Sequence, residues 1–328
     1  MAEVNAKMIT RLVTFVTILV ALTALPAQAQ ERFSFFQAST PESVERMLTL
    51  AGLRDDDLVL DLGSGNGLIP LTAARMNPRL RGRGVDIDAN LVDESNQQAR
   101  REGLADRVRF EHRNAFDADL REATVVTMWL FPELMRLLRP VILERARPGT
   151  RVLTSTWDLG SWQPDKVSQD VTPVFMWIVP ARVAGGWDWD LSMAGRQYRY
   201  ASVLEQRFQV VEGVARAGDR REVLEGVTLR GDDIAFKLNI TLEGLGLTQH
   251  EFSGKVSDGQ IVGTVKVTPS NQGTISLDWR ARRVERSDYF APTGTAVARP
   301  LDQIRILNNH LAGTQGLLRE LKRQERRK

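Results

Sequence analysis

Apolar and polar residues follow two different periods in the first half of the chain. Runs of mostly apolar residues, such as 57–62 and 123–129, are typical of strands buried on both faces. Between such runs, apolar residues recur every three to four positions, as in 41–51, which predicts amphipathic helices. Strands that alternate with helices predict a doubly wound, mainly parallel α/β sheet over residues 31–186. The predicted strands are 57–62, 82–88, 108–112, 123–129 and 151–156, with helices starting near residues 40, 68, 90 and 132.

After residue 186 the pattern changes to strands alone. Six are predicted, over 198–211, 223–229, 234–238, 252–256, 261–267 and 275–283. Turn sequences separate them, among them Ser-Asp-Gly-Gln at 257–260, a strong hairpin signal. Short strands with regular turns predict a small antiparallel barrel or sandwich over residues 187–298. The sequence leaves its role open between a substrate-binding or targeting module and a structural appendage.

The two ends of the chain carry separate signals. A basic segment precedes an apolar run, 12–25, and Ala27-Gln28-Ala29 follows it. This pattern is typical of a secretory signal peptide, residues 1–29, and predicts a periplasmic or secreted protein. The alternative is an uncleaved membrane anchor, although the run is shorter than the ~20 residues that span a bilayer. Residues 299–328 predict a helix with a basic end, which is either a solvated tail or a contact to an anionic membrane surface.

Composition excludes several kinds of site. The 328 residues include no cysteine, which excludes disulfides, thiolate metal sites and a cysteine nucleophile. The three histidines are far apart in sequence, so no metal site is predicted. A formal net charge of +3 is too small to indicate a nucleic-acid partner. The oligomeric state is left open.

A glycine-rich segment joins the first predicted strand to the helix after it. Gly63, Gly65 and Gly67 would let the backbone approach a ligand closely, and the start of the helix would offer free N–H groups. Their spacing is G-x-G-x-G instead of the G-x-G-x-x-G of dinucleotide sites, and Asp61 stands two residues before them. A carboxylate there would repel a pyrophosphate but suits the ammonium group of an amino acid. These features favour S-adenosylmethionine over NAD.

A second acidic residue stands at the end of the next predicted strand. Asp86 comes 19 residues after Gly67, close to the ~20-residue spacing at which ribose hydroxyls are bound. Asn114 and Ala115 follow the third strand, where an adenine amino group could be hydrogen-bonded. The sequence therefore predicts a nucleoside site along the carboxyl ends of the first three strands.

These segments resemble the motifs of the class I S-adenosylmethionine-dependent methyltransferases. Residues 59–67, Val-Leu-Asp-Leu-Gly-Ser-Gly-Asn-Gly, are similar to the first motif of the class. Residues 84–88, 114–115 and 125–133 are similar to its second, third and fourth motifs, in the same order. The resemblance covers about 120 residues and implies the Rossmann-like fold, S-adenosylmethionine as cofactor and methyl transfer as activity.

Two subgroups of the class are similar to this chain. Residues 130–133, Leu-Phe-Pro-Glu, and 147–152 resemble a branch that includes the lysine methyltransferase of the ATP synthase c subunit. Residues 158–162 and 177–183 are more similar to bacterial proteins of unassigned substrate. Those proteins pair this domain with a signal peptide and a C-terminal β segment.

The resemblance implies a role for each matching residue. Asp61 would hold the amino group of the cofactor's methionine part, and Asp86 would bind both ribose hydroxyls. Ile87 would pack on the adenine, and Asn114 replaces the aspartate that is commoner at its position in the family. Thr40 would meet the cofactor carboxylate. The implied cofactor-binding residues are Thr40, Asp61, Gly63, Ser64, Gly65, Gly67, Asp86, Ile87, Asn114 and Ala115.

The acceptor side is less defined. Trp129 and Phe131 would either line a substrate pocket or fill the end of the sheet. Glu133 would either orient an amine or only begin its helix, where an acidic residue is favoured in any case. Trp129 and Glu133 are the catalytic candidates, whereas His112 is interpreted as a surface or core residue. No known target signature follows the fourth strand, so the acceptor is left open between a protein lysine and a small molecule.

A second hypothesis is an exported, non-catalytic protein that binds a ligand or partner on a methyltransferase-like scaffold. It follows from a conflict within the sequence, because the cofactor is made in the cytosol while residues 1–29 predict export.

Overall fold

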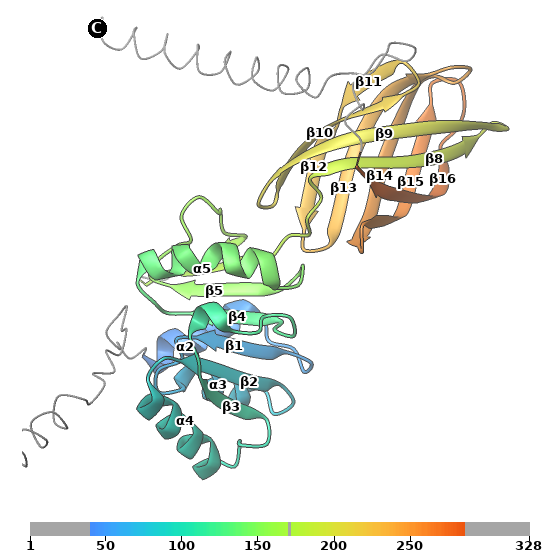
Figure 1. Cartoon of the computed structure of the whole chain (residues 1–328). Coiled ribbons are helices and arrows are strands. Elements are labelled where there is room, and N and C mark those ends of the chain that lie inside the picture. Colours follow the sequence, from blue (N-terminus) through green and yellow to red (C-terminus); the bar gives the residue numbers. More distant parts are fainter. Residues whose placement is uncertain (1–39, 170–171, 286–328) are drawn as a thin grey trace, which may run out of the picture. The chain divides into compact units, whose positions relative to one another are not determined.

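The computed structural model describes residues 40–169 and 172–285 (Figure 1). The predicted signal peptide and basic tail lie outside these residues and stay predictions. The described residues comprise a first part with helices and a sheet, and a second part of strands alone. In the described part of the chain, no helix has the length and apolar character needed to cross a membrane.

Sheet A of the first part has seven strands in the order β3-β2-β1-β4-β5-β7-β6. Five of them are parallel: β1 (Leu58–Leu62), β2 (Arg81–Asp86), β3 (Val108–His112), β4 (Val125–Met128) and β5 (Arg151–Ser155). These are the predicted strands, so the doubly wound, mainly parallel architecture is confirmed. Two strands that were not predicted extend the sheet, β7 (Val174–Ile178), antiparallel to β5, and β6 (Lys166–Val167), antiparallel to β7.

Helices cover both faces of sheet A (Figure 1). The helices are α2 (Pro41–Ala51), α3 (Leu68–Met76), α4 (Ala89–Arg101) and α5 (Pro132–Arg145), with a 3-10 turn, η1 (Ala115–Asp117). One core cluster joins residues of α2, α3 and α4 to strand residues such as Val59 and Leu153. The alternate strand residues, such as Leu60 and Val152, pack with α5 on the other face. The period-two alternation of strands thus sends neighbouring side chains into separate cores.

Helix α2 places its first residues at the carboxyl end of the sheet. Thr40 caps the helix by accepting from Ser43 N at 3.3 Å. At the other end, Arg151 Nη1 donates to the carbonyls of Ala51 and Gly52, both at 2.8 Å. Because Arg151 is the first residue of β5, the last turn of α2 lies at the amino ends of the strands. Thr40 therefore lies at the opposite edge, where ligands bind in sheets of this type.

The same arginine forms a buried ion pair at the amino end of the sheet. Arg151 Nη2 contacts Asp57 Oδ1, and the Asp57 side chain is completely buried. Asp57 also accepts hydrogen bonds from Thr124 Oγ1 at 2.7 Å and from Arg54 N at 2.6 Å. The carboxylate is thus satisfied on both oxygens, which is the condition for keeping a charge in a core.

Sheet B of the second part has nine antiparallel strands in the order β11-β10-β9-β8-β16-β15-β14-β13-β12. The strands are β8 (Gly185–Met193), β9 (Arg196–Arg207), β10 (Val210–Ala217), β11 (Arg220–Val223), β12 (Glu225–Arg230), β13 (Asp233–Leu242), β14 (Gly246–Ser257), β15 (Gln260–Pro269) and β16 (Ile275–Val284). Strands β12 and β13 contact β10 and β11, so the sheet curls into a nearly closed barrel (Figure 1).

The predicted count of six strands is wrong for this part. The segment 198–211 is two strands, β9 and β10, joined by a tight turn in which Phe208 has a φ of 57°. Phenylalanine rarely adopts that conformation, so no turn signal marks the hairpin in the sequence. The segment 223–229 is divided between β11 and β12, and β8 was not predicted.

The interior of the barrel is aromatic. Trp189 stacks on Tyr200 with ring centroids 5.4 Å apart, and Tyr200 Oη lies 2.9 Å from His250 Nε2. His250 Nδ1 lies 3.1 Å from Leu238 O. Burial lowers the pKa of His250 to about 4, so its imidazole is neutral at pH 7. His250 is therefore a hydrogen-bonded core residue.

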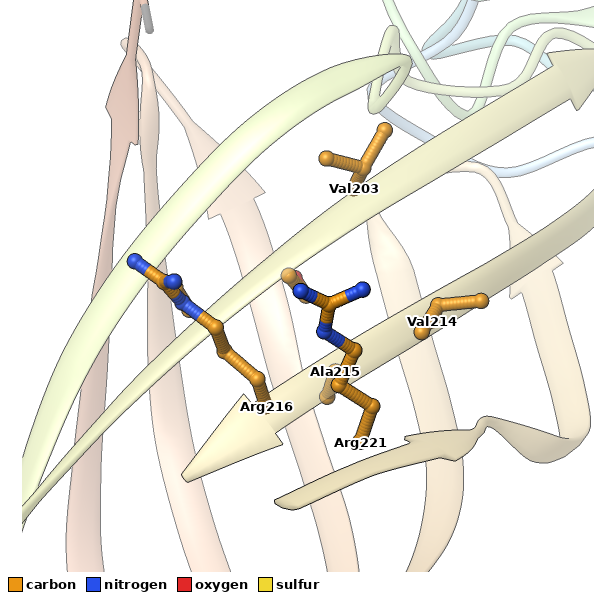
Figure 2. A pocket seen from close by; sticks show the side chains of 7 residues that line it. Val203, Val214, Ala215, Arg216 and Arg221 are labelled. Carbon is orange, nitrogen blue, oxygen red and sulfur yellow. The ribbon is translucent and has the colours of Figure 1, made fainter. Parts of the chain in front are cut away.

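Sheet B also carries a shallow depression between β9, β10 and β11 (Figure 2). Arg216 and Arg221 stand opposite each other there on neighbouring strands, beside Val203 and Val214 (Figure 2). Both arginines have interaction partners within the protein. The pair is therefore not a set of free cations.

Candidate functional site

The loop between β1 and α3 lies tightly against its neighbours. Gly63 N and Ser64 N donate to the same carbonyl of β2, at 2.9 and 3.0 Å. Gly67, which precedes α3, has a left-handed φ of 78°, and a Cβ on it would lie 2.6 Å from the Phe110 ring. A Cβ on Gly84 of β2 would lie 2.6 Å from the Ser64 side chain. Glycine is therefore required both in the loop, at Gly67, and in the strand beside it, at Gly84.

Asp86 at the end of β2 is fixed by backbone donors. Its Oδ2 accepts from Gly65 N at 2.7 Å, and its Oδ1 accepts from Asp88 N at 2.9 Å. The side chain is half-buried, and each carboxylate oxygen keeps a second lone pair. Asp86 thus ties the glycine loop to the end of β2 and presents acceptors for a ligand with two hydroxyl groups.

Asp61 at the end of β1 is buried, with 2% of its surface exposed. Its Oδ1 accepts from Thr127 Oγ1 of β4 at 2.7 Å. Burial, with the nearby negative charge of Asp86, raises the pKa of Asp61 to about 7, although the Thr127 hydrogen bond opposes the shift. A buried carboxyl poised in this way favours a cationic group of a ligand.

Two further residues, which the sequence did not predict, hold Asp61 and the glycine loop in place. Thr127 positions Asp61, and Ser95 of α4 donates through Oγ to Gly65 O at 3.1 Å. Both side chains are fully or almost fully buried. A hydroxyl residue on an otherwise apolar face could have indicated both residues. Thr127 lies in the apolar run 123–129, and Ser95 lies on the buried face of α4.

The residues predicted to contact the adenine follow the carboxyl ends of β2 and β3. Ile87 is half-buried, and its carbonyl lies 2.9 Å from His112 Nε2. Asn114 accepts from Phe116 N through Oδ1 at 3.0 Å and so caps η1, which begins at Ala115. Asn114 therefore already has a structural role. A ligand could still bind its Nδ2 group or the second lone pair of Oδ1.

Two further predicted residues carry hydroxyls. Ser64 is buried, and among the described residues its Oγ has no hydrogen-bond partner. Such a group calls for an explanation, and a polar ligand in the loop supplies one. Thr40 is exposed and donates to Ser43 Oγ at 3.0 Å. The predicted role of Thr40 toward a carboxylate stays a prediction.

The candidates for the acceptor side lie at the end of β4. Trp129 is half-buried and packs against the core cluster of the α2–α4 face. Phe131 is 46% exposed and precedes α5. Glu133 is exposed in the first turn of α5, where an acidic residue also stabilises the helix.

The arrangement fits a particular kind of ligand. A buried carboxyl with a pKa near 7 stands at the end of β1, and a fixed, accessible carboxylate stands at the end of β2. Between them lie a bare loop and the unpartnered hydroxyl of Ser64. A molecule that joins an amino acid to a nucleoside, as S-adenosylmethionine does, has the ammonium and the ribose hydroxyls that these groups would bind.

Comparison with known proteins identifies relatives of the first part. A family model for the ANTKMT methyltransferase domain matches residues 61–166. A protein-lysine N-methyltransferase of Saccharolobus islandicus is 36% identical over 129 residues, which cover 39% of this chain and 80% of that protein. The adenine nucleotide translocase lysine N-methyltransferase of Mus musculus is 29% identical over 129 residues, but the match spans only 56% of its length.

A solved structure is also similar. It is a crystal structure of an RNA methyltransferase from Salinibacter ruber in complex with S-adenosyl-L-homocysteine, with 39% sequence identity and a TM-score of 0.43. The match covers 45% of this chain and 96% of that chain.

The matches to the archaeal enzyme and to the family model agree with the motifs and with the geometry of the loop and its two carboxylates. The cofactor is S-adenosylmethionine, and the chain belongs to the family of S-adenosylmethionine-dependent methyltransferases that includes the protein-lysine N-methyltransferases.

Proposed function

We propose that this methyltransferase transfers its methyl group to the side-chain amine of a protein lysine. The observation that carries the proposal is the 36% identity to the archaeal protein-lysine N-methyltransferase, because the match covers 80% of that enzyme. The mouse relative is also named for lysine methylation. Asp61, the glycine loop and Asp86 all lie within residues 61–166, which the family model matches.

The chemistry asks little of the protein beyond binding and alignment. Bound S-adenosylmethionine supplies a methyl group that its sulfonium already activates. Asp61 and Asp86 are themselves fixed by hydrogen bonds and would bind the amino group and the ribose of the cofactor. The methyl group would then have a defined position, with which an incoming nucleophile can be aligned. The acceptor nitrogen must be neutral, and its lone pair forms the new N–C bond while the electrons of the broken S–C bond stay on sulfur. The methylated nitrogen carries the positive charge and later releases a proton to water.

Transfer of a radioactive methyl group tests this proposal. We expect the protein to label random peptides with a central lysine at least ~10-fold more than the same peptides with arginine in that place. Mass spectrometry of the labelled peptides should locate the methyl group on the lysine. Label in total RNA instead of peptides would contradict the lysine proposal. An absence of transfer to either acceptor would favour the non-catalytic scaffold.

Cofactor affinity should depend on pH through Asp61. With a pKa of about 7, its carboxyl is largely protonated at pH 6 and ionised at pH 8. The ammonium group of the ligand binds the ionised form, so affinity for S-adenosylhomocysteine should rise about 10-fold between these pH values. Isothermal titration calorimetry measures the affinity.

Two controls isolate that carboxyl. Asp61→Asn should bind more weakly at pH 8 and lose the pH dependence, because an amide does not titrate in this range. 5′-Methylthioadenosine, which lacks the amino acid part, should bind the unaltered protein equally at both pH values. An affinity that stays flat or falls as pH rises would show that Asp61 does not bind the ammonium group.

A further inference from the structure

The turn that follows β5 has a strained backbone. Thr156 has a φ of 72°, a left-handed conformation that β-branched residues rarely adopt. Three hydrogen bonds hold the turn: Thr156 N donates to Pro173 O at 2.9 Å, Trp157 N to Ser155 O at 2.8 Å, and Thr154 Oγ1 to Trp157 O at 2.5 Å. Strain that neighbouring bonds maintain is concentrated at functional sites in proteins.

Thr156 differs from the other left-handed residues of the described chain. Apart from glycines these are Ala194, Phe208 and Asp258. Each of them lies in a short turn between consecutive strands of sheet B, where a positive φ matches the twist of the hairpin. Thr156 is instead followed by a loop, so hairpin geometry does not account for its conformation.

The result of the turn is an indole at the surface. Trp157 is 50% exposed, although its backbone is hydrogen-bonded on both sides. The residue before the turn adds a second observation, because Ser155 is completely buried and its Oγ has no hydrogen-bond partner among the described residues. A buried hydroxyl without a partner is uncommon, and this one can accept or donate a hydrogen bond to a further molecule.

Strand register places this turn beside the candidate acceptor residues. Strands β4 and β5 are parallel, and Met128 pairs with Thr154 at their carboxyl ends. Phe131 follows the end of β4 by three residues, and Trp157 follows the end of β5 by two. Neighbouring strands lie ~4.8 Å apart, so the two exposed aromatic residues start from adjacent strand ends.

The cofactor residues occupy the other strand ends. Asp61 ends β1, Asp86 ends β2, and Asn114 follows β3. In the sheet order β3-β2-β1-β4-β5, the ends of β4 and β5 are therefore left for the second substrate. Phe131 and Trp157 follow these two strand ends, and their side chains are 46% and 50% exposed.

We propose that Trp157, held outward by the left-handed turn at Thr156, forms a wall of the acceptor site and packs on the side chain of the lysine to be methylated. This inference rests on the proposed lysine methylation. A lysine side chain has four methylene groups that lie well on an aromatic ring, and its amine before deprotonation is attracted to the ring face. Phe131 would provide the opposite wall. Trp157 is thus a specificity-determining residue, separate from the cofactor-binding residues.

A bisubstrate compound tests this role without a known protein substrate. In the probe, nitrogen replaces the sulfur of S-adenosylhomocysteine and carries a two-carbon link to a secondary amine, whose butyl group takes the place of the four lysine methylene groups. The reference compound carries a methyl group on the same nitrogen. Calorimetry with the full chain should show that the amine arm raises affinity ~10-fold, because the arm stands in for the lysine side chain.

Substitutions at Trp157 should remove the gain from the arm alone. In Trp157→Ala we expect the arm to raise affinity less than ~2-fold, while the reference compound binds as in the unaltered protein. Trp157→Phe should keep most of the gain. Trp157→Gln retains bulk without a ring, and it serves in place of alanine if alanine loosens the turn. Leu137→Ala, which truncates a 60% exposed apolar residue of α5, is the matched control and should behave as unaltered protein.

The outcomes separate the two proposals. If Trp157→Ala and Trp157→Gln keep the full gain, Trp157 does not contact the acceptor, and lysine methylation stands. If the arm gives no gain in the unaltered protein, the site does not receive an alkyl amine, and both proposals fail together.

Discussion

Asp86→Ala should weaken binding of S-adenosylhomocysteine at least ~100-fold, because it removes two hydrogen bonds to a charged acceptor. The carboxylate also organises the site from within, since Gly65 N donates to Oδ2 at 2.7 Å and Asp88 N to Oδ1 at 2.9 Å. Without it, Gly65 loses its bond to the end of β2, and the loop keeps only the bonds of Gly63 N and Ser64 N to the Val85 carbonyl. Isothermal titration calorimetry on the full chain measures the loss.

Asp88→Ala is the matched control for this substitution. Asp88 is a carboxylate two residues later, and its Oδ1 caps α4 by accepting from Asn90 N at 3.0 Å. We expect this variant to lose ~1 kcal/mol of stability through the missing cap while its cofactor affinity stays near that of the unaltered protein. Equal affinities for the Asp86→Ala variant and the unaltered protein would remove Asp86 from the cofactor site.

Arg151→Met should destabilise the first part of the chain by ~3–5 kcal/mol, because it removes the nearer cation of the completely buried Asp57 and leaves only the more exposed Arg54, whose Nε lies 3.8 Å from Oδ1. The arginine also donates to the last carbonyls of α2, so its loss frees two helix-end acceptors as well. Urea unfolding followed by circular dichroism at 222 nm is the suitable measurement. The described α-helices all belong to this part, so that signal reports on it.

Two variants show whether the uncompensated charge is the cause. Asp57→Asn combined with Arg151→Met should recover a large share of the loss, because an amide keeps hydrogen bonds without a charge. Arg121→Ala removes an arginine from an exposed ion pair with Asp119 and should leave the unfolding curve unchanged. If Arg151→Met unfolds at the same urea concentration as the unaltered protein, the pair contributes nothing to stability.

Local patterns explain why much of the first part was predictable. Buried parallel strands are continuous apolar runs, and the glycine loop with Asp61 and Asp86 lies at strand ends that those runs define. The partners of these residues depend on pairing across the sheet. Thr127 meets Asp61 only because β1 and β4, which are 66 residues apart in sequence, are neighbours in sheet A. A short-range pattern in a single sequence cannot predict a contact between residues that far apart.

The second part shows the limit of turn signals. The hairpin at Asp258 and Gly259 follows a known turn preference, and it was predicted. The hairpin at Phe208 and Gln209 has neither glycine nor asparagine, so its two strands were joined into one. Strand β8 alternates Trp187, Trp189 and Leu191 on the buried face, a period-two pattern that was present but overlooked.

The strand order of sheet A has a consequence for how the chain is made. β1 is an internal strand of the sheet, yet one of its two neighbours, β4, is completed only at Met128. A nascent polypeptide that has reached His112 contains β1, β2 and β3. The backbone edge of β1 that later pairs with β4 is still open. Translation that stops in this interval yields a fragment prone to self-association, and the carboxyl edge that carries Asp61 and Asp86 is completed only when β4 pairs with β1.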